Sequence, residues 1–412
     1  MQAAWLVVSL LVALEPGIEV RQVTHGPKHH FFGYIGQSQT IPWNESGRYI
    51  VALQTDFHDH MPQAGEPADV ILIDTRDGDA IRVVDQTRAW NFQQGTMLYW
   101  NPLHPETQFF FNDRDPKTNQ IFCALFDIST GKRIAEYRYE DSPFGNSGVA
   151  PRGGWFAGLN YGRLARLRPV TGYPGAFDWT MSGTATAPST APINDGVFLV
   201  NAANREKRLL VSFERLAAVL APRYPNAVRQ ELFINHTLWN RECDRIFFFV
   251  RGDFETKQRL DVPMIIRPDG SGLAMLADHL GGHPEWALGH TMIGSIGDRA
   301  VLYDVDRGVT IRTLGEGGVL GDPRGDKSLS PEGDWLVNGF RERGLNYYVL
   351  YRMSDGAHVR SRGFDQHGWT SGELRVDPAP CWNRDGTQIL FPSITEDGNT
   401  RQLFAIELNK RS

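Results

Sequence analysis

The chain has 412 residues, of which 41% are apolar and 22% are charged, and its formal net charge is −6. This apolar content excludes an intrinsically disordered chain. The acidic balance argues against a nucleic-acid partner, because nucleic-acid-binding proteins carry a basic excess. The 42 glycines and 24 prolines favour many short strands joined by tight turns. The scattered cysteines have no zinc or redox spacing and are expected to be buried thiols: Cys123, Cys243 and Cys381.

The first predicted element is an N-terminal segment, residues 1–24. Its apolar run, residues 3–14, has the length of a signal-peptide core, but no Lys or Arg precedes it and no clear cleavage site follows. We expect an exported, periplasmic protein rather than a cytoplasmic one, and the alternative is a strand or helix packed on the domain. The run is too short to cross a bilayer, and no other stretch is long enough, so no integral membrane segment is expected.

A short phrase recurs along the chain. It reads Trp43-Asn-Glu-Ser-Gly47, then Ser330-Pro-Glu-Gly333, then Trp382-Asn-Arg-Asp-Gly386, and a run of strand-forming residues follows each copy. A polar turn that leads into a short apolar strand at blade-like spacing is typical of a β-propeller. A β-sandwich is the alternative, but it does not explain why the phrase recurs at both ends of the chain.

Residues 25–412 are therefore predicted to form one all-β domain, a seven-bladed β-propeller. Each unit pairs an inner strand with a second strand, often closed by a D-G or S/T-x-G turn. Residues 213–221 are the exception, because their apolar residues have helical spacing. The seven units, in chain order, cover residues 41–84, 108–132, 154–200, 245–272, 290–304, 335–356 and 388–407.

The phrase also predicts which residues share one height around the propeller axis. Counting three residues back from each Trp, or from its equivalent, places His236, His283, Asp326 and Ala379 at the same level of successive blades, with Asp377 two residues away. Imidazoles and carboxylates that converge in this way form either a divalent-metal site or an acid–base site. The alternative is that these side chains only cap strand ends.

Other polar residues are predicted to lie near the same end of the propeller. A pair of histidines precedes the first unit, an amide-rich run precedes the second, an arginine follows a buried strand, and further arginines are grouped after the third inner strand. The arginines suit a carboxylate ligand, or else form a solvated face. The residues concerned are His29, His30, Arg88, Gln93, Gln94, Arg114, Arg163, Arg166 and Arg168. The run Asp56-Phe-His58-Asp-His60 fits either a metal site or an exposed loop.

Several segments resemble the oligogalacturonate lyases and their TolB-like, WD40-type propeller relatives. They are Asn235-His-Thr-Leu-Trp239, Gly282-His-Pro-Glu-Trp286, Arg88-Ala-Trp-Asn-Phe-Gln-Gln-Gly95, and the run from Gly372 to Gly386. The resemblance implies β-elimination on uronate-containing oligosaccharides, as in pectin degradation, with a manganese-type divalent ion. It implies that His236 is the base and His283 a metal ligand. The lyases carry His-Pro-His-Pro where this chain has Asp377-Pro-Ala379-Pro, so one ligand is replaced by Asp and another is lost.

Three functions are compatible with these residues. The first is a lyase in which His236 takes the proton, a metal or the group of Arg163 and Arg166 neutralises the carboxylate, and Tyr161 or water protonates the leaving oxygen. The second is a non-catalytic propeller that binds carbohydrate or protein, and the third is a glycoside hydrolase using Asp326 and Asp377. For the lyase, the predicted substrate-binding residues are His30, Arg88, Gln93, Gln94, Arg114 and Arg166, and the predicted metal ligands are His283, Asp326 and Asp377.

Overall fold

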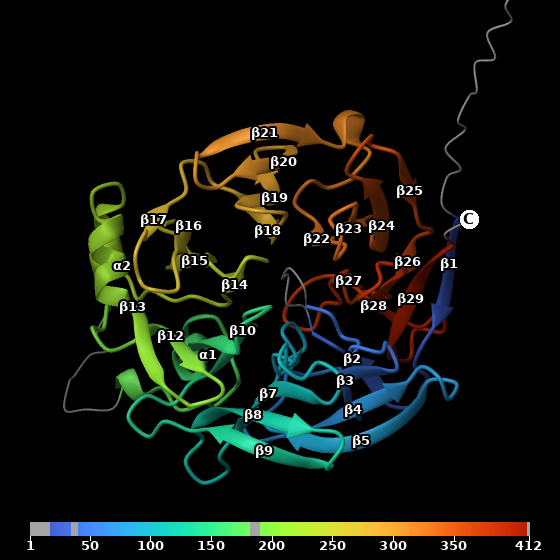
Figure 1. The fold of residues 1–412 in the computed structure, drawn as a ribbon, viewed down its shortest axis with the longest axis horizontal. Helices are drawn as coiled ribbons and strands as arrows, with labels where there is room; N and C mark the ends of the chain where they lie inside the picture. Colours follow the sequence, from blue (N-terminus) through green and yellow to red (C-terminus); the bar gives the residue numbers. More distant parts are fainter. Residues whose placement is uncertain (1–16, 34–39, 182–189, 410–412) are drawn as a thin grey trace, which may run out of the picture.

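The computed structural model describes residues 17–33, 40–181 and 190–409. In this part of the chain, antiparallel sheets stand side by side around a common centre (Figure 1). The innermost strands, such as β14 (Leu238–Trp239) and β27 (Cys381–Trp382), surround that centre, and strands such as β5 (Ala80–Thr87) form the rim. The fold is a mostly-β propeller.

Five of its sheets have four strands each. The first contains β2 (His29–Phe31), β3 (Tyr49–Thr55), β4 (Ala68–Asp74) and β5, and the second contains β6 (Tyr99–Trp100), β7 (Gln108–Arg114), β8 (Ile121–Asp127) and β9 (Lys132–Tyr137). The third contains β10 (Gly145–Val149), β11 (Trp155–Leu159), β12 (Gly196–Asn201) and β13 (Lys207–Ser212). The fourth contains β14, β15 (Ile246–Gly252), β16 (Leu260–Ile266) and β17 (Ala274–Met275), and the fifth contains β1 (Gly17–Gln22), β27, β28 (Gln388–Ile394) and β29 (Arg401–Asn409).

The remaining sheet is a curled sheet of nine strands. One half contains β18 (Gly281–Trp286), β19 (Thr291–Ile296), β20 (Arg299–Asp304) and β21 (Val309–Leu314). The other half contains β22 (Asp326–Leu329), β23 (Trp335–Glu342), β24 (Leu345–Arg352) and β25 (His358–Arg360), with β26 (Phe364–Asp365) also paired to β24. The halves meet through parallel pairing of β18 with β22, in which His283 and Asp326 are register partners.

Strand β1 completes the last sheet from the other end of the chain. It runs antiparallel to β29, with Gly17 opposite Asn409 and Gln22 opposite Phe404. This pairing protects an edge of β29 that would otherwise expose unpaired backbone groups. The apolar run at residues 3–14, for which a signal peptide was predicted, lies outside the described residues. None of the helices in the described ranges is long and apolar enough to cross a membrane.

Tryptophans at the inner strands fasten four of the described sheet junctions, and three of them, Trp100, Trp239 and Trp382, belong to a Trp-Asn pair. The indole N–H of Trp382 donates to Ser328 O at 2.9 Å, and that of Trp286 donates to Leu238 O at 2.8 Å. Trp100 and Trp239 make the corresponding bonds to Pro42 O and Gly148 O. These buried indoles must satisfy their polar N–H group, and the neighbouring inner strand supplies the acceptor.

The asparagine of the phrase closes the turn that follows. Asn383 Oδ1 accepts the N–H groups of Thr387 and Gln388, each at 2.9 Å, and Asn44 and Asn240 accept the corresponding N–H groups in their own turns. A side chain that satisfies two backbone donors in this way favours a tight turn between strands.

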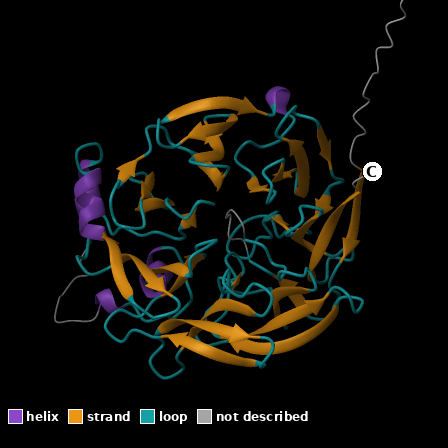
Figure 2. Ribbon diagram, in the orientation of Figure 1, coloured by secondary structure: helices purple, strands orange, loops and turns teal. Residues whose placement is uncertain are grey.

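Helices lie in the connections between strands. The predicted helix at residues 213–221 is confirmed as α2 (Phe213–Leu220), which is capped by Ser212 and lies at the rim beside β13 (Figure 2). Helix α1 (Tyr161–Leu167) follows β11 and is capped by Asn160. Three short 3-10 turns complete the described helical segments: η1 (Trp179–Met181), η2 (Pro225–Arg229) and η3 (Glu316–Gly318).

Candidate functional site

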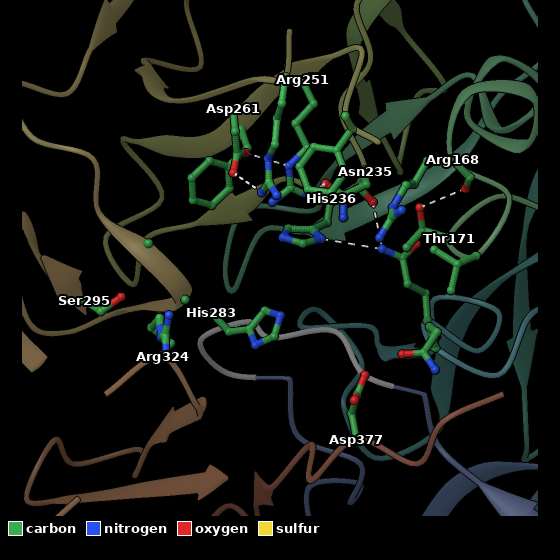
Figure 3. A pocket seen from close by; sticks show the side chains of 18 of the residues that line it. Arg168, Thr171, Asn235, His236, Arg251, Asp261, His283, Ser295, Arg324 and Asp377 are labelled. Atoms are coloured by element: carbon green, nitrogen blue, oxygen red, sulfur yellow. Dashed lines mark hydrogen bonds and ion pairs between the residues drawn. The ribbon is translucent and has the colours of Figure 1, made fainter. Parts of the chain in front are cut away.

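A cavity of about 520 Å³ lies where the inner strands of several sheets converge (Figure 3). Its wall is built by β18, by the ends of β15 and β16, by the C-terminal end of α1, and by the segments that lead into β6, β14 and β27. The polar and aromatic residues that line it are Gln93, Gln94, Arg168, Thr171, Asn235, His236, Phe249, Arg251, Phe254, Arg259, Asp261, His279, His283, Ser295, Arg324, Arg375 and Asp377. These lining residues come from segments that are far apart in the sequence, from Gln93 to Asp377.

Positive charge dominates this wall, because five arginines face two aspartates. Arg251 and Arg259 share Asp261, which lies 2.8 Å from a nitrogen of each. Both guanidinium groups, together with that of Arg168, also lie over the ring of Phe254. Guanidinium groups gathered at this density favour a ligand that carries negative charge.

The charges in this wall influence one another. Burial lowers the pKa of Arg168 to about 10, and the like charges of Arg251, Arg375 and Arg259 act in the same direction. Burial alone would raise the pKa of Asp261, but hydrogen bonding to His279 and the charge of Arg251 outweigh it, so this carboxyl stays ionised. These arginines are paired with carboxylates, since Arg168 contacts Glu255, Arg324 contacts Asp322, Arg375 contacts Asp377, and Arg251 and Arg259 share Asp261. An anionic ligand would add negative charge where several guanidinium groups still repel one another.

His236 is the most buried imidazole of the cavity wall. It stands two residues before β14 and is 7% exposed. Burial, followed by the charges of Arg251 and His283, lowers the pKa of His236 to about 3. Its Nδ1 lies 3.5 Å from Nε2 of Gln94, whose amide donates to Asn235 O at 2.9 Å. His236 is therefore neutral near pH 7, the form in which an imidazole accepts a proton.

His283 and Asp326 are in contact across the junction of β18 and β22. Nδ1 of His283 lies 2.5 Å from Oδ1 of Asp326, and the backbone N–H of Ala379 donates to Oδ2 of Asp326 at 2.9 Å. The imidazole is 39% exposed and the carboxylate only 5%. Burial acts to raise the pKa of Asp326, but the charge of His283 and the hydrogen bonds outweigh it and lower that pKa.

Asp377 lies on the segment before β27 and faces the same space as His283 and His236 (Figure 3). Its Oδ1 lies 3.0 Å from Nε of Arg375 and 3.9 Å from Nη2 of Arg341. Burial and then the neighbouring Asp326 carboxylate raise the pKa of Asp377, against the opposing charges of Arg375 and His283. The two aspartates therefore have different environments, and Asp326 is the one that stays ionised.

The residues present do not fit the divalent metal that the resemblance implies. Both oxygens of Asp326 and Nδ1 of His283 are already engaged, and Asp377 is paired with Arg375. At the third ligand position Ala379 offers only its backbone. In residues 17–33, 40–181 and 190–409, no group of three or more His, Cys, Asp or Glu is arranged to hold a metal ion.

Several residues that the sequence singled out lie outside this lining. Tyr161 is fully buried and its hydroxyl donates to Asn146 O at 3.0 Å. Arg163 is buried in α1 and donates to Leu232 O and Thr190 O, while Arg166 pairs with Asp178 and Glu231. These side chains hold α1 in place, and the catalytic and binding roles predicted for them are not carried forward.

The remaining substrate-binding residues are divided between two environments. His30 is buried and lies within hydrogen-bond distance of Gln402 and Gln54, and Arg114 donates to Pro174 O. The backbone N–H of Arg88 donates to Asp113, and none of these three residues is part of the lining. Gln93 and Gln94 do line the cavity, where Gln93 donates to Arg375 O at 3.0 Å.

Sequence reasoning missed the side chains that give the cavity its charge. Arg251 lies near the end of β15, directly after the buried apolar run 246–250, and a position after such a run is what led the sequence analysis to select Arg114. Arg375 stands two residues before Asp377, inside a segment that carries the resemblance. No sequence motif marks Arg259 or Asp261. Their place in the cavity wall depends on how β15 and β16 are oriented toward the centre of the propeller.

Comparisons with known proteins find similar solved structures at low sequence identity. Neither the family models nor the curated proteins contain a match to this chain. The β-propeller domain of Cps50 (Swd1) from Myceliophteria thermophila is 12% identical, with 95% of this chain and 99% of that chain covered and a TM-score of 0.48. TolB from Acinetobacter baumannii is 10% identical, covering 87% and 80%, with a TM-score of 0.40.

A third structure, a putative TolB from Agrobacterium tumefaciens, is 12% identical, with 96% of this chain and 98% of that chain covered and a TM-score of 0.42. The chain is similar to these propellers, and its own propeller fold is given by the arrangement of its sheets. Similarity at this level says nothing about a ligand or a reaction, so the resemblance to oligogalacturonate lyases stays a prediction.

Proposed function

We propose that the protein is a seven-bladed propeller whose axial cavity binds uronate-containing oligosaccharides and cleaves them by β-elimination. The blade count follows if the nine-stranded sheet is two four-stranded blades joined at one parallel pair. Each of its halves repeats the antiparallel meander of the other sheets, and β18 and β22 both occupy the innermost position.

The choice of ligand rests on the chemistry of the cavity wall. Uronates offer a carboxylate for each sugar ring, and the wall offers guanidinium groups at several points. Arg375 lies beside Asp377, and the backbone of Arg324 lies beside Gly282, the residue before His283. Arg168, Arg251 and Arg259 surround Phe254. A cavity of about 520 Å³ has the size expected for a short oligosaccharide or a similar small ligand.

The single observation that carries the reaction is a neutral, buried imidazole beside this positive charge. The C5 hydrogen of a uronate becomes removable when the adjacent carboxylate is neutralised as negative charge develops. Arginines of the wall supply that neutralisation, and neutral His236 takes the proton. The C5–H electron pair then forms the C4=C5 double bond as the C4–O bond breaks. No divalent ion takes part in these steps.

A second candidate is a propeller that binds the same acidic sugars without cleaving them. Ala379 favours it, since a backbone N–H stands where the resemblance implies a catalytic metal ligand. A glycoside hydrolase is less well supported, because Asp326 is 5% exposed and both of its oxygens are engaged. Two carboxyl groups that flank a glycosidic bond have to reach it.

The test is to incubate the full chain with uronate disaccharides and longer oligomers and to follow the ultraviolet absorbance of an unsaturated uronate. We expect this signal with the wild type and a loss of at least about 10²-fold with His236→Ala. His25→Ala is the matched control, since His25 is an exposed residue outside the cavity lining. Tight binding by calorimetry with no unsaturated product would favour the binding propeller instead.

A further inference from the structure

We propose that Arg168 and Arg259 form a subsite at the mouth of the cavity that binds the carboxylate of a third uronate unit. The assignment rests on the proposed function and states which ligand length the cavity prefers. Both arginines line the cavity, and its volume of about 520 Å³ has the size expected for a short oligosaccharide. A longer ligand therefore extends beyond the inner wall, and the residues at the mouth decide whether its next unit is held.

The mouth is recognised by a change in exposure between two arginines that share one carboxylate. Arg251 donates from Nε to Oδ1 of Asp261 at 2.8 Å, and Arg259 donates from Nη2 to Oδ2 at 2.8 Å. The side chain of Arg251 is 14% exposed and that of Arg259 is 49% exposed. Arg251 also donates to Oδ1 of Asn235, the residue before His236, at 2.7 Å. Arg251 thus belongs to the inner wall, and Arg259 lies where the cavity opens to solvent.

An aromatic ring keeps Arg259 beside Arg168. Phe254 lies in residues 253–259, the connection between β15 and β16, and its ring centroid is 3.7 Å from Cζ of Arg259 and 4.8 Å from Cζ of Arg168. The ring of buried Phe233 meets the Phe254 ring edge-on, with centroids 6.2 Å apart. Because cations are attracted to an aromatic face, Phe254 gathers two guanidinium groups that come from different segments of the chain.

Both guanidinium groups keep hydrogen-bond donors for a ligand. Within the described residues, Arg259 reaches a carboxylate through Nη2 and Arg168 reaches one through Nη1. The other side-chain nitrogens of these two arginines have no acceptor in that part of the chain. Since a guanidinium carries five N–H groups in a planar fork that matches a carboxylate, each arginine can bind a ligand carboxylate in addition to its present partner.

Glu255 indicates that a carboxylate fits at this subsite. Its Oε1 contacts Nη1 of Arg168, and its side chain is 71% exposed. An ion pair at this exposure contributes little to stability, so a ligand carboxylate can replace Glu255 beside Arg168 at small cost. Glu255 is therefore a competitor of the ligand, and its removal should strengthen binding of a third unit. A purely structural role of Glu255 predicts no such gain.

The test compares the 4-linked dimer and trimer of one uronic acid, chosen from galacturonic, mannuronic and glucuronic acid as the one whose dimer binds most tightly. Affinities are measured by calorimetry in His236→Ala protein, in which the expected loss of cleavage keeps the ligands intact. We expect the trimer to bind about five- to tenfold more tightly than the dimer. In Arg259→Gln this advantage should fall below about twofold, whereas the dimer affinity should stay within about twofold.

Two further variants sharpen the comparison. Glu255→Gln should raise the affinity for the trimer by about two- to fivefold and leave the affinity for the dimer unchanged. Arg360→Gln is the matched control for Arg259→Gln and should change neither affinity. Arg360 likewise pairs with a carboxylate, that of Glu342, and lies 4.0 Å from the ring centroid of Tyr347, but it is outside the cavity lining.

Three results would overturn the subsite. They are equal affinities for dimer and trimer, an equal loss of both affinities in Arg259→Gln, and no gain of trimer affinity in Glu255→Gln. If Arg259→Gln does not fold, as judged by circular dichroism and melting, the result for Glu255→Gln decides the matter. A protein that binds none of the dimers and trimers would refute the proposed function itself, which is a different result.

Discussion

Nδ1 of His283 on β18 lies 2.5 Å from Oδ1 of Asp326 on β22, at the only place where the two halves of the described nine-stranded sheet pair with each other. The contact lies where two sheets of the propeller pair, and one of its residues, His283, lines the cavity. The same pairing that fixes the position of β22 brings a carboxylate behind an imidazole that reaches the ligand space. A change at either residue therefore has both a structural and a functional consequence.

Ligand affinity should depend on the arginines of the cavity wall. Arg375→Gln removes a guanidinium that lines the cavity and keeps a side chain of similar length. Since hydrogen bonds to charged groups contribute about 1.5–3 kcal/mol, we expect binding of a uronate disaccharide to weaken by roughly 10- to 100-fold in calorimetry. Arg362→Gln, at an exposed arginine paired with Glu396, should leave the affinity unchanged. Equal affinities for wild type and Arg375→Gln would show that the ligand binds elsewhere.

Removal of divalent metals should leave ligand binding intact. The donor atoms that the resemblance assigns to a metal are occupied by the pairs His283–Asp326 and Asp377–Arg375. We expect purified protein to contain far less than one equivalent of manganese or a similar ion, and chelation to change neither the melting temperature nor the disaccharide affinity. A stoichiometric ion that is lost in His283→Gln would contradict this expectation.

Stability should fall in acid partly through His236. Its pKa is about 3 in the folded protein and near the ordinary value of 6.5 when unfolded, so the unfolded state binds the proton more tightly. The contribution is therefore present above about pH 6.5 and is lost as the pH falls toward 3. The difference in unfolding free energy between wild type and His236→Gln should change by about 1.4 kcal/mol per pH unit in this window. Denaturant titrations at several pH values measure it, and a pH-independent difference would show that His236 titrates normally.

The turn asparagine of the recurring phrase should contribute measurably to stability. Asn383→Ala leaves the N–H group of Gln388 without its acceptor, whereas the N–H of Thr387 keeps Asp385 Oδ1 at 3.1 Å; the lost bond costs about 1–3 kcal/mol if water does not replace it. Asn399→Ala, at an exposed loop position, is the control and should change the unfolding free energy by less than about 0.5 kcal/mol. Thermal and denaturant unfolding both report the difference.

Part of the fold follows from local patterns. The Trp-Asn phrase predicts a repeated sheet because the same two contacts recur at several junctions, an indole that reaches the preceding sheet and an amide that closes a turn. The apolar residues at helical spacing in residues 213–221 predict α2, because residues at this spacing lie on one face of a helix. The phrase also placed His283 level with Asp326, and the register of β18 with β22 confirms that placement.

The candidate site was less predictable. Tyr161 and Arg163 have the right chemistry, but α1 turns them toward backbone carbonyl groups and away from the cavity. Arg251 and Arg259 were overlooked because each stands alone in the sequence. Only the approach of β15 and β16 to α1 gathers these arginines with Arg168 over one aromatic ring.

The sequence by itself determined the repeating strands, the turns between them and the common height of His283 and Asp326, because these depend on spacing along a regular element. Only the tertiary structure decided what each of those side chains meets. A carboxylate lies behind His283, an arginine lies beside Asp377, and His236 is buried without an ionised partner at contact distance. Charge, burial and protonation depend on neighbours that come from other sheets, and spacing along one strand carries no information about them.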